Sequence, residues 1–136
     1  MTGHHFTIAY WCVLVAALLP IVCAGIAKSG KMTIPPREGG YDNNNPRSWL
    51  AQQTDWRGRA NAAQANTFEA LPFFFAAVIV AHALQAEQAR LDILAITFIV
   101  LRMVYIVMYV ADMAKLRSVV WALGFLVNVG ILFSAF

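Results

Sequence analysis

The chain has 136 residues, of which 60% are hydrophobic and only 12% are charged, and its formal net charge is +3. Soluble domains are about half apolar and about a quarter charged, and a chain this short has too much surface to hide such an excess of apolar side chains. The composition therefore excludes an ordinary soluble domain and favours a membrane protein. The small positive charge, without a basic patch interleaved with aromatic residues, does not favour nucleic-acid binding.

Four apolar runs follow one another along the chain, at residues 6–27, 67–86, 91–111 and 118–136. Each approaches the length of about 20 residues that a helix needs to cross the hydrocarbon layer. The first run is too long for a signal-peptide core, and the three later runs favour a polytopic protein over a single signal anchor. We therefore expect one all-α domain over residues 1–136, an integral membrane four-helix bundle.

A polar connection, residues 28–57, separates the first two runs and contains the breaker pairs Pro35-Pro36 and Gly39-Gly40. Four spans place this connection and the one after the third run on one side of the membrane, and both termini on the other. The first side holds most of the basic residues: Lys28, Lys31, Arg37, Arg47, Arg57, Arg59, Lys115 and Arg117. By the positive-inside rule, the long connection is cytoplasmic and the termini lie on the opposite side.

The second helix is expected to start near Asp55, which is a plausible N-cap, and to run without a break into the apolar segment. Arg59, Asn66 and Glu69 follow the spacing of three and four residues that places side chains on one helical face. Glu69 lies where the apolar part has already begun. A carboxylate at such a depth is expected to face other protein or a wet cavity rather than lipid.

The third run carries a second polar face, formed by Arg102, Tyr105 and Tyr109, and Arg117 opens the fourth run. Two interpretations stay open. In the first, Glu69 and Arg102 pair across helices to hold the bundle together and the tyrosines belong to an interfacial belt. In the second, the two aligned faces form a site, in which the excess of arginines over acids suits an anionic ligand.

The remaining reactive side chains do not indicate a further site. Cys12 and Cys23 would be about 16 Å apart along one helix, too far to bridge, so buried thiols are expected. His82 is isolated, and neither it nor the N-terminal histidines has a partner at metal-ligand spacing. No metal site is predicted.

Three motifs resemble those of the MAPEG family, the membrane-associated proteins in eicosanoid and glutathione metabolism. They are RANAAQANTFEALPFF at residues 59–74, Arg102-x-x-Tyr105-x-x-x-Tyr109, and Arg117-Ser118-Val119. The segment YDNNNPR, from Tyr41 to Arg47, looks like the loop of bacterial members. The resemblance runs from Lys28 onward and includes the four-span layout.

The resemblance implies a homotrimer, here in a bacterial inner membrane, with glutathione bound between subunits near the cytoplasmic boundary. It implies that Arg117 stabilises the glutathione thiolate, while a lipophilic co-substrate or lipid arrives from the bilayer. Carried over by position, the residues implied to bind glutathione are Lys28, Arg59, Asn66, Glu69, Arg102, Tyr105 and Tyr109.

Two functions follow from the resemblance. The first is a glutathione-dependent transferase or peroxidase acting on lipophilic electrophiles. The second is a non-catalytic membrane protein that binds lipids or scaffolds a partner. One departure separates this chain from many members, which carry an arginine four residues before Asn66, where this chain has Ala62. Arg59 lies one turn earlier on the same face.

Overall fold

The computed structural model describes residues 5–136, and these residues form helices and loops with no strand. Four long helices run along a common axis: α1 (Ile8–Lys28), α3 (Asp55–Ala83), α4 (Gln88–Val110) and α5 (Ala114–Leu132). All four are long and apolar enough to cross a membrane, which confirms an all-helical, integral membrane architecture.

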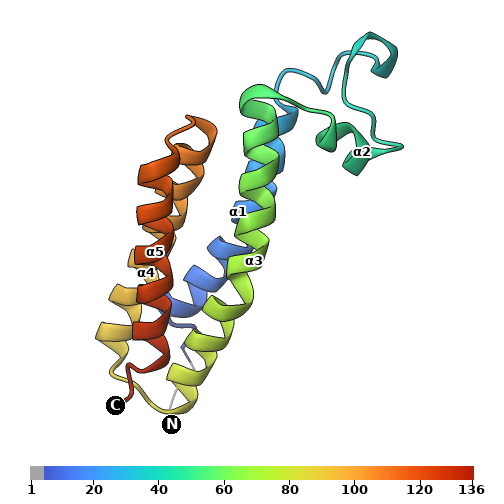
Figure 1. Ribbon diagram of the computed structural model, residues 1–136. Coiled ribbons are helices and arrows are strands. Elements are labelled where there is room, and N and C mark those ends of the chain that lie inside the picture. Colours follow the sequence, from blue (N-terminus) through green and yellow to red (C-terminus); the bar gives the residue numbers. More distant parts are fainter. Residues whose placement is uncertain (1–4) are drawn as a thin grey trace.

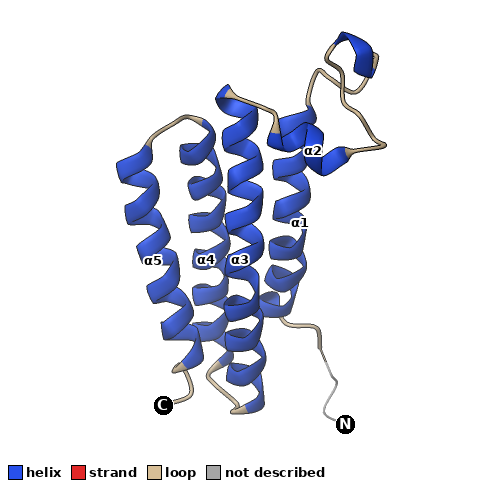
Figure 2. Ribbon diagram, turned by 45° about the vertical axis from the view of Figure 1, so that its right-hand side comes forward, coloured by secondary structure: helices blue, strands red, loops and turns tan. Residues whose placement is uncertain are grey.

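The helices alternate in direction, so α1 begins and α5 ends at the same end of the bundle as the α3–α4 connection (Figure 1). The long connection between α1 and α3 and the turn between α4 and α5 lie at the opposite end. Figure 2 shows α5, α4, α3 and α1 side by side, with the long connection extending beyond the bundle. This layout brings the basic residues of the two connections to one end. The orientation in the membrane stays a prediction.

The long connection contains a short 3-10 helix, η1 (Pro36–Glu38), and a short helix, α2 (Pro46–Ala51). Trp49 and Leu50 of α2 are buried against Ala27 and Ala60 at the ends of α1 and α3. Apolar contacts therefore attach this otherwise polar segment to the bundle.

Helix α3 begins at Asp55, and Thr54 takes the preceding cap position without a side-chain cap bond. Asp55 has a left-handed φ of 54°, which aspartate tolerates better than most residues. Its Oδ1 accepts a hydrogen bond of 3.0 Å from the backbone N–H of Arg57. The Asp55 side chain therefore satisfies an N–H of the first turn that would otherwise lack a partner, which is the role of an N-cap side chain. Asp55 is, however, the first residue of the helix, and Thr54 is the residue at the N-cap position.

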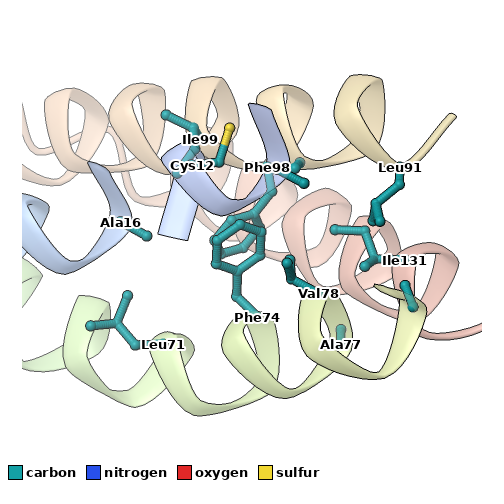
Figure 3. Close-up of a cluster of buried hydrophobic side chains, with 13 residues drawn as sticks. Cys12, Ala16, Leu71, Phe74, Ala77, Val78, Leu91, Phe98, Ile99 and Ile131 are labelled. Atoms are coloured by element: carbon teal, nitrogen blue, oxygen red, sulfur yellow. The ribbon is translucent and has the colours of Figure 1, made fainter. Parts of the chain in front are cut away.

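Aromatic stacking joins α3 to α4 in the main core cluster. Phe74 and Phe98 stack with their ring centroids 4.3 Å apart and an interplanar angle of 19°. Figure 3 shows the two rings meeting in the middle of the cluster, with Cys12 and Ala16 of α1 nearby. Cys12 and Cys23 are free and buried, as expected from the sequence.

The helices are unequally covered by protein. In the apolar part of α1, α3 and α4, 33% of residues are buried, whereas only 17% are buried in α5. Helix α5 is therefore the most exposed span, and it forms one wall of the site described next.

Candidate functional site

Arg102 is the central charged group of the membrane-spanning region. It lies on α4 and is only 3% exposed. Its two terminal nitrogens each donate 3.1 Å hydrogen bonds to Oδ1 of Asn66, and Nη2 also donates to Oγ1 of Thr67 at 2.8 Å. The guanidinium lies over the ring of Tyr105, 4.2 Å from its centroid.

No carboxylate of residues 5–136 neutralises Arg102. The one ion pair among these residues joins Arg90 to Glu87, at the other end of α4. Glu69 does not bond to Arg102, and its side chain is exposed on α3. The interpretation in which these two residues pair within one chain is therefore wrong, and both charges stay available to other groups.

A cavity of about 260 Å³ lies between α3, α4 and α5 beside Arg102. It is called the α3–α5 cavity below. Most of its wall is aromatic or small. Its lining residues are Asn66, Glu69, Ala70, Phe73, Phe98, Arg102, Tyr105, Val120, Trp121, Gly124, Phe125 and Asn128. Because Trp121 and Phe125 are themselves 46% and 44% exposed, the cavity opens on the outer surface of the bundle.

A smaller recess of about 190 Å³ adjoins the cavity and contains Arg117. Asn66, Tyr105 and Trp121 line both spaces, and Ser118 lines the recess with Arg117. The guanidinium of Arg117 lies 4.1 Å from the ring centroid of Tyr109, which in turn makes an edge contact with Tyr105. The recess therefore presents a half-exposed cation at the end of the bundle that carries the α4–α5 turn.

The structure thus brings together six of the residues selected from the sequence, from three helices: Asn66, Glu69, Arg102, Tyr105, Tyr109 and Arg117. The other two lie apart from both spaces. Lys28 lies over the ring of Tyr41, with Nζ 4.4 Å from the centroid. Arg59 donates from Nε to the carbonyl of Val110, the last residue of α4, at 3.0 Å.

Two polar residues of this region were not singled out by the sequence analysis. Thr67 binds Arg102, and Asn128 of α5 lines the cavity while only 3% exposed. The available signal was periodicity, because positions 117, 121, 124 and 128 repeat at three to four residues and share one face of α5. No group of three histidine, cysteine, aspartate or glutamate side chains within 5–136 is arranged to hold a metal ion.

The fold and the site together define an integral membrane protein with four helical spans and a polar site, partly lined by aromatic residues, between three of them. A family model for the MAPEG family matches residues 8–136 of this chain. The chain therefore belongs to the MAPEG family, which includes glutathione transferases and peroxidases as well as other members. No curated protein and no solved structure matches it.

Proposed function

We propose that this protein is a membrane-bound, glutathione-dependent transferase or peroxidase that acts on lipophilic electrophiles. The observation that carries the proposal is the uncompensated charge of Arg102 beside a cavity. A buried cation is tolerated when it is paired and hydrogen-bonded, and no carboxylate of residues 5–136 pairs with Arg102. An anionic peptide bound at this face would supply the missing charge.

Glutathione fits the residues present. It carries two carboxylates and an ammonium group, and the site offers cations together with the exposed carboxylate of Glu69. Asn66 and Glu69 hold the polar groups of the tripeptide, and Arg102 and Tyr105 attract its carboxylates or contact its backbone. Tyr109 supports Arg117 through the cation–π contact.

Arg117 has the catalytic role in this proposal. A free thiol has a pKa of about 8.5 and is mostly protonated at neutral pH, whereas a neighbouring guanidinium favours the reactive thiolate. In a transfer reaction the sulfur forms a bond to the electrophilic carbon, and the displaced electron pair leaves with the departing group or takes up a proton. In a peroxidase reaction two glutathione molecules reduce one hydroperoxide to an alcohol and water and become one disulfide.

We also propose that the active assembly is a homotrimer with the peptide between subunits. An exposed carboxylate on a membrane-spanning helix is costly against lipid, so the Glu69 face of α3 is better covered by protein or ligand. Lys28 and Arg59 line neither the α3–α5 cavity nor the adjoining recess of their own chain. Within an assembly they would contribute to the pocket of a neighbouring subunit.

A non-catalytic lipid-binding protein is the second candidate, and two observations favour it. The wall of the α3–α5 cavity is largely aromatic, including Phe73, Phe98 and Phe125. In addition, the position one turn before Asn66 is Ala62, so it adds no positive charge to the peptide-binding face. Both observations fit a site for a hydrocarbon chain better than one for a charged peptide.

Glutathione binding is tested first by the thermal stability of the purified protein in detergent. A ligand that binds only the folded state must raise the melting temperature as its concentration rises. Conjugation of a lipophilic electrophile and reduction of a lipid hydroperoxide are then measured with the wild type, Arg117→Ala and Lys115→Ala. Lys115 is the matched control, because it is an exposed cation in the same first turn of α5 and lines neither the cavity nor the recess.

Arg117→Ala should still be stabilised by glutathione but should lose activity on the order of 100-fold, the usual effect of removing one group that stabilises a reacting anion. Lys115→Ala should retain its activity. The absence of any stabilisation by glutathione, or full activity of Arg117→Ala, would overturn the enzymatic proposal. Stabilisation by lipid without thiol consumption would favour the non-catalytic candidate.

A further inference from the structure

Arg102 holds the side-chain amide of Asn66 in one orientation. Nη1 and Nη2 of Arg102 each lie 3.1 Å from Oδ1 of Asn66. A guanidinium only donates hydrogen bonds, so the atom that meets it must be the amide oxygen. If the amide were reversed, two N–H groups of the arginine would face the amide nitrogen, and a buried charged donor would lose both bonds. The amide of Asn66 is therefore fixed with its oxygen towards α4.

This orientation limits what Asn66 can offer to a ligand. A carbonyl oxygen has two lone pairs, and the two hydrogen bonds from Arg102 use both of them. The amide nitrogen, Nδ2, can only donate. Towards a ligand, Asn66 is therefore a donor, which suits a carboxylate or a peptide carbonyl and does not suit an ammonium group.

The Nδ2 group is the part of the Asn66 amide that a ligand can reach. Asn66 is partly exposed, and the buried side-chain atoms without a partner among residues 5–136 belong to Arg102 and Asn128, not to Asn66. Asn66 lines both the α3–α5 cavity and the recess that contains Arg117. Because Oδ1 is turned towards Arg102, a peptide bound in these two spaces meets the amide from its Nδ2 side.

Arg102 itself is poorly placed to contact such a peptide. It is only 3% exposed, and its three hydrogen bonds all go to side chains of α3, those of Asn66 and Thr67. Its guanidinium also lies over the ring of Tyr105. The charge still acts on the site through the amide. A charged donor polarises the amide that accepts from it, and this strengthens the hydrogen bond that the amide donates in turn.

We propose that Arg102 is a positioning residue for glutathione binding, which locks and polarises the Asn66 amide so that its Nδ2–H group donates to an acceptor of the peptide. The inference rests on the proposed function, because glutathione is the ligand in both. It assigns to Arg102 a role that acts through Asn66 instead of by direct contact. Glutathione binding by the wild type tests the proposed function, and the variants below test the inference separately.

Asn66→Asp and Asn66→Leu test the lock without glutathione. Aspartate has the same shape as asparagine and keeps an oxygen for Arg102, whereas leucine removes the acceptor that both terminal nitrogens share. In thermal unfolding of the full-length protein in one detergent, Asn66→Asp should be at least as stable as the wild type. Asn66→Leu should unfold at a lower temperature. Equal melting temperatures of Asn66→Leu and the wild type would overturn the lock.

Glutathione affinity is measured by the same assay as the glutathione concentration rises. Aspartate has no N–H group to donate, so Asn66→Asp should bind glutathione about 10- to 100-fold more weakly than the wild type. Wild-type affinity in this variant would overturn the inference and leave the proposed function standing. No stabilisation of the wild type by glutathione would overturn both.

Asn61→Asp is the matched control for the added negative charge. Asn61 is also a partly exposed residue of α3, but it lines neither the cavity nor the recess. Its affinity for glutathione should stay within about twofold of the wild type. An equal loss of affinity in Asn61→Asp and Asn66→Asp would show that charge on α3, and not the lost donor, weakens binding, which would refute the assignment.

A double-mutant cycle shows through which residue Arg102 acts. Arg102→Met should weaken glutathione binding in the wild-type background but should have no further effect in Asn66→Leu, because no amide is left to hold. A merely structural role would lower the melting temperature without this dependence of affinity on Asn66. The same loss of affinity from Arg102→Met in both backgrounds would indicate direct contact with the peptide and would refute the positioning role.

Nuclear magnetic resonance keeps the inference testable if the leucine and methionine variants do not fold. In protein with isotope-labelled asparagine, the side-chain amide signals of Asn66 are those that disappear in Asn66→Asp. Glutathione should shift these signals and leave those of Asn61 unchanged. Unshifted Asn66 signals in a protein that glutathione stabilises would show that other groups bind the peptide, and the inference would be wrong.

Discussion

Replacing Thr67 with valine tests how firmly the bundle holds Arg102. Thr67 is fully buried, and its hydroxyl donates to the carbonyl of Ala63 at 2.7 Å while accepting from Nη2 of Arg102 at 2.8 Å. Valine has nearly the same shape but no hydroxyl. The substitution therefore removes one partner of a buried, charged donor without opening a cavity.

Two ranges bound the expected loss of stability from Thr67→Val. Hydrogen bonds to charged groups contribute about 1.5–3 kcal/mol in soluble proteins. Side-chain hydrogen bonds between membrane helices average about 0.6 kcal/mol, with a maximum of about 1.7 kcal/mol. Because Arg102 is charged and only 3% exposed, we expect a loss towards the upper part of the membrane range, about 1–1.7 kcal/mol.

Reversible unfolding in mixed micelles with increasing sodium dodecyl sulfate measures this loss. Thr97→Val is the matched control. Thr97 donates the same kind of bond to a carbonyl four residues back, that of Ile93 at 2.7 Å, but no arginine bonds to it. The control should change the free energy of unfolding by less than about 0.5 kcal/mol. Equal losses in the two variants would refute the claim that Thr67 stabilises the buried guanidinium.

Three further substitutions test other parts of the bundle. Phe74→Ala removes a fully buried ring stacked on α4 and should cost about 3–5 kcal/mol in the same unfolding assay, whereas Phe68→Ala, at a position 53% exposed, should cost less than about 0.5 kcal/mol. Asp92→Ala removes a carboxylate that accepts a 2.9 Å hydrogen bond from the backbone N–H of Ala9 in the first turn of α1, and it should lower the free energy of unfolding by about 1 kcal/mol. Asp92→Asn should restore most of this loss if the hydrogen bond rather than the charge stabilises the helix start. Gly40→Ala would place a Cβ against the backbone oxygen of Ile34 and should speed cleavage of the long connection by trypsin. Gly25→Ala, with no atom within 4 Å of the added Cβ, should not speed this cleavage, and equal cleavage rates in the two variants would contradict the close packing at Gly40.

The spans were predictable because the membrane requires long apolar helices, and this requirement acts on each segment separately. The two polar faces were predictable for the same local reason, since residues three and four apart share a helical face. Periodicity does not tell which members of two faces meet. From periodicity alone, Glu69 and Asn66 were equally placed to contact Arg102. The packing of α3 on α4 brings Asn66 and Thr67, rather than Glu69, within hydrogen-bonding distance of the Arg102 guanidinium.

The partners of long basic side chains were not predictable from their positions. The resemblance to the MAPEG family implied that Lys28 and Arg59 bind glutathione, by their positions in the chain. Within one subunit, Lys28 lies over Tyr41 and Arg59 bonds to the carbonyl of the last residue of α4, and their part in glutathione binding stays a prediction. Flexible stems allow such side chains to reach several partners, so the tertiary structure decides among them. Asn128 was missed for the opposite reason, since a lone amide in an apolar run gives no charge signal.

Two regions of the bundle differ in how completely their polar groups are paired: the end with the α3–α4 connection, and the α3–α5 cavity. At the end with the α3–α4 connection, His82 bonds to Thr7 and stacks on Tyr10, and Asp92 joins α4 to the start of α1. Hydrogen bonds within one chain satisfy these polar groups, so a structural role accounts for them.

Polar groups around the α3–α5 cavity are not satisfied in this way. Nε of Arg102 and Oδ1 of Asn128 are the unpartnered buried side-chain atoms among residues 5–136, and the two residues that carry them line the α3–α5 cavity. Glu69, on the same cavity, is exposed on a membrane-spanning helix. Unpaired buried groups lower the stability of a fold unless something binds them, so their concentration in one place is best explained by ligand binding rather than by packing. The same reasoning limits the site to three helices, because α1 contributes no residue to the cavity wall and serves to hold α3 and α4 in place.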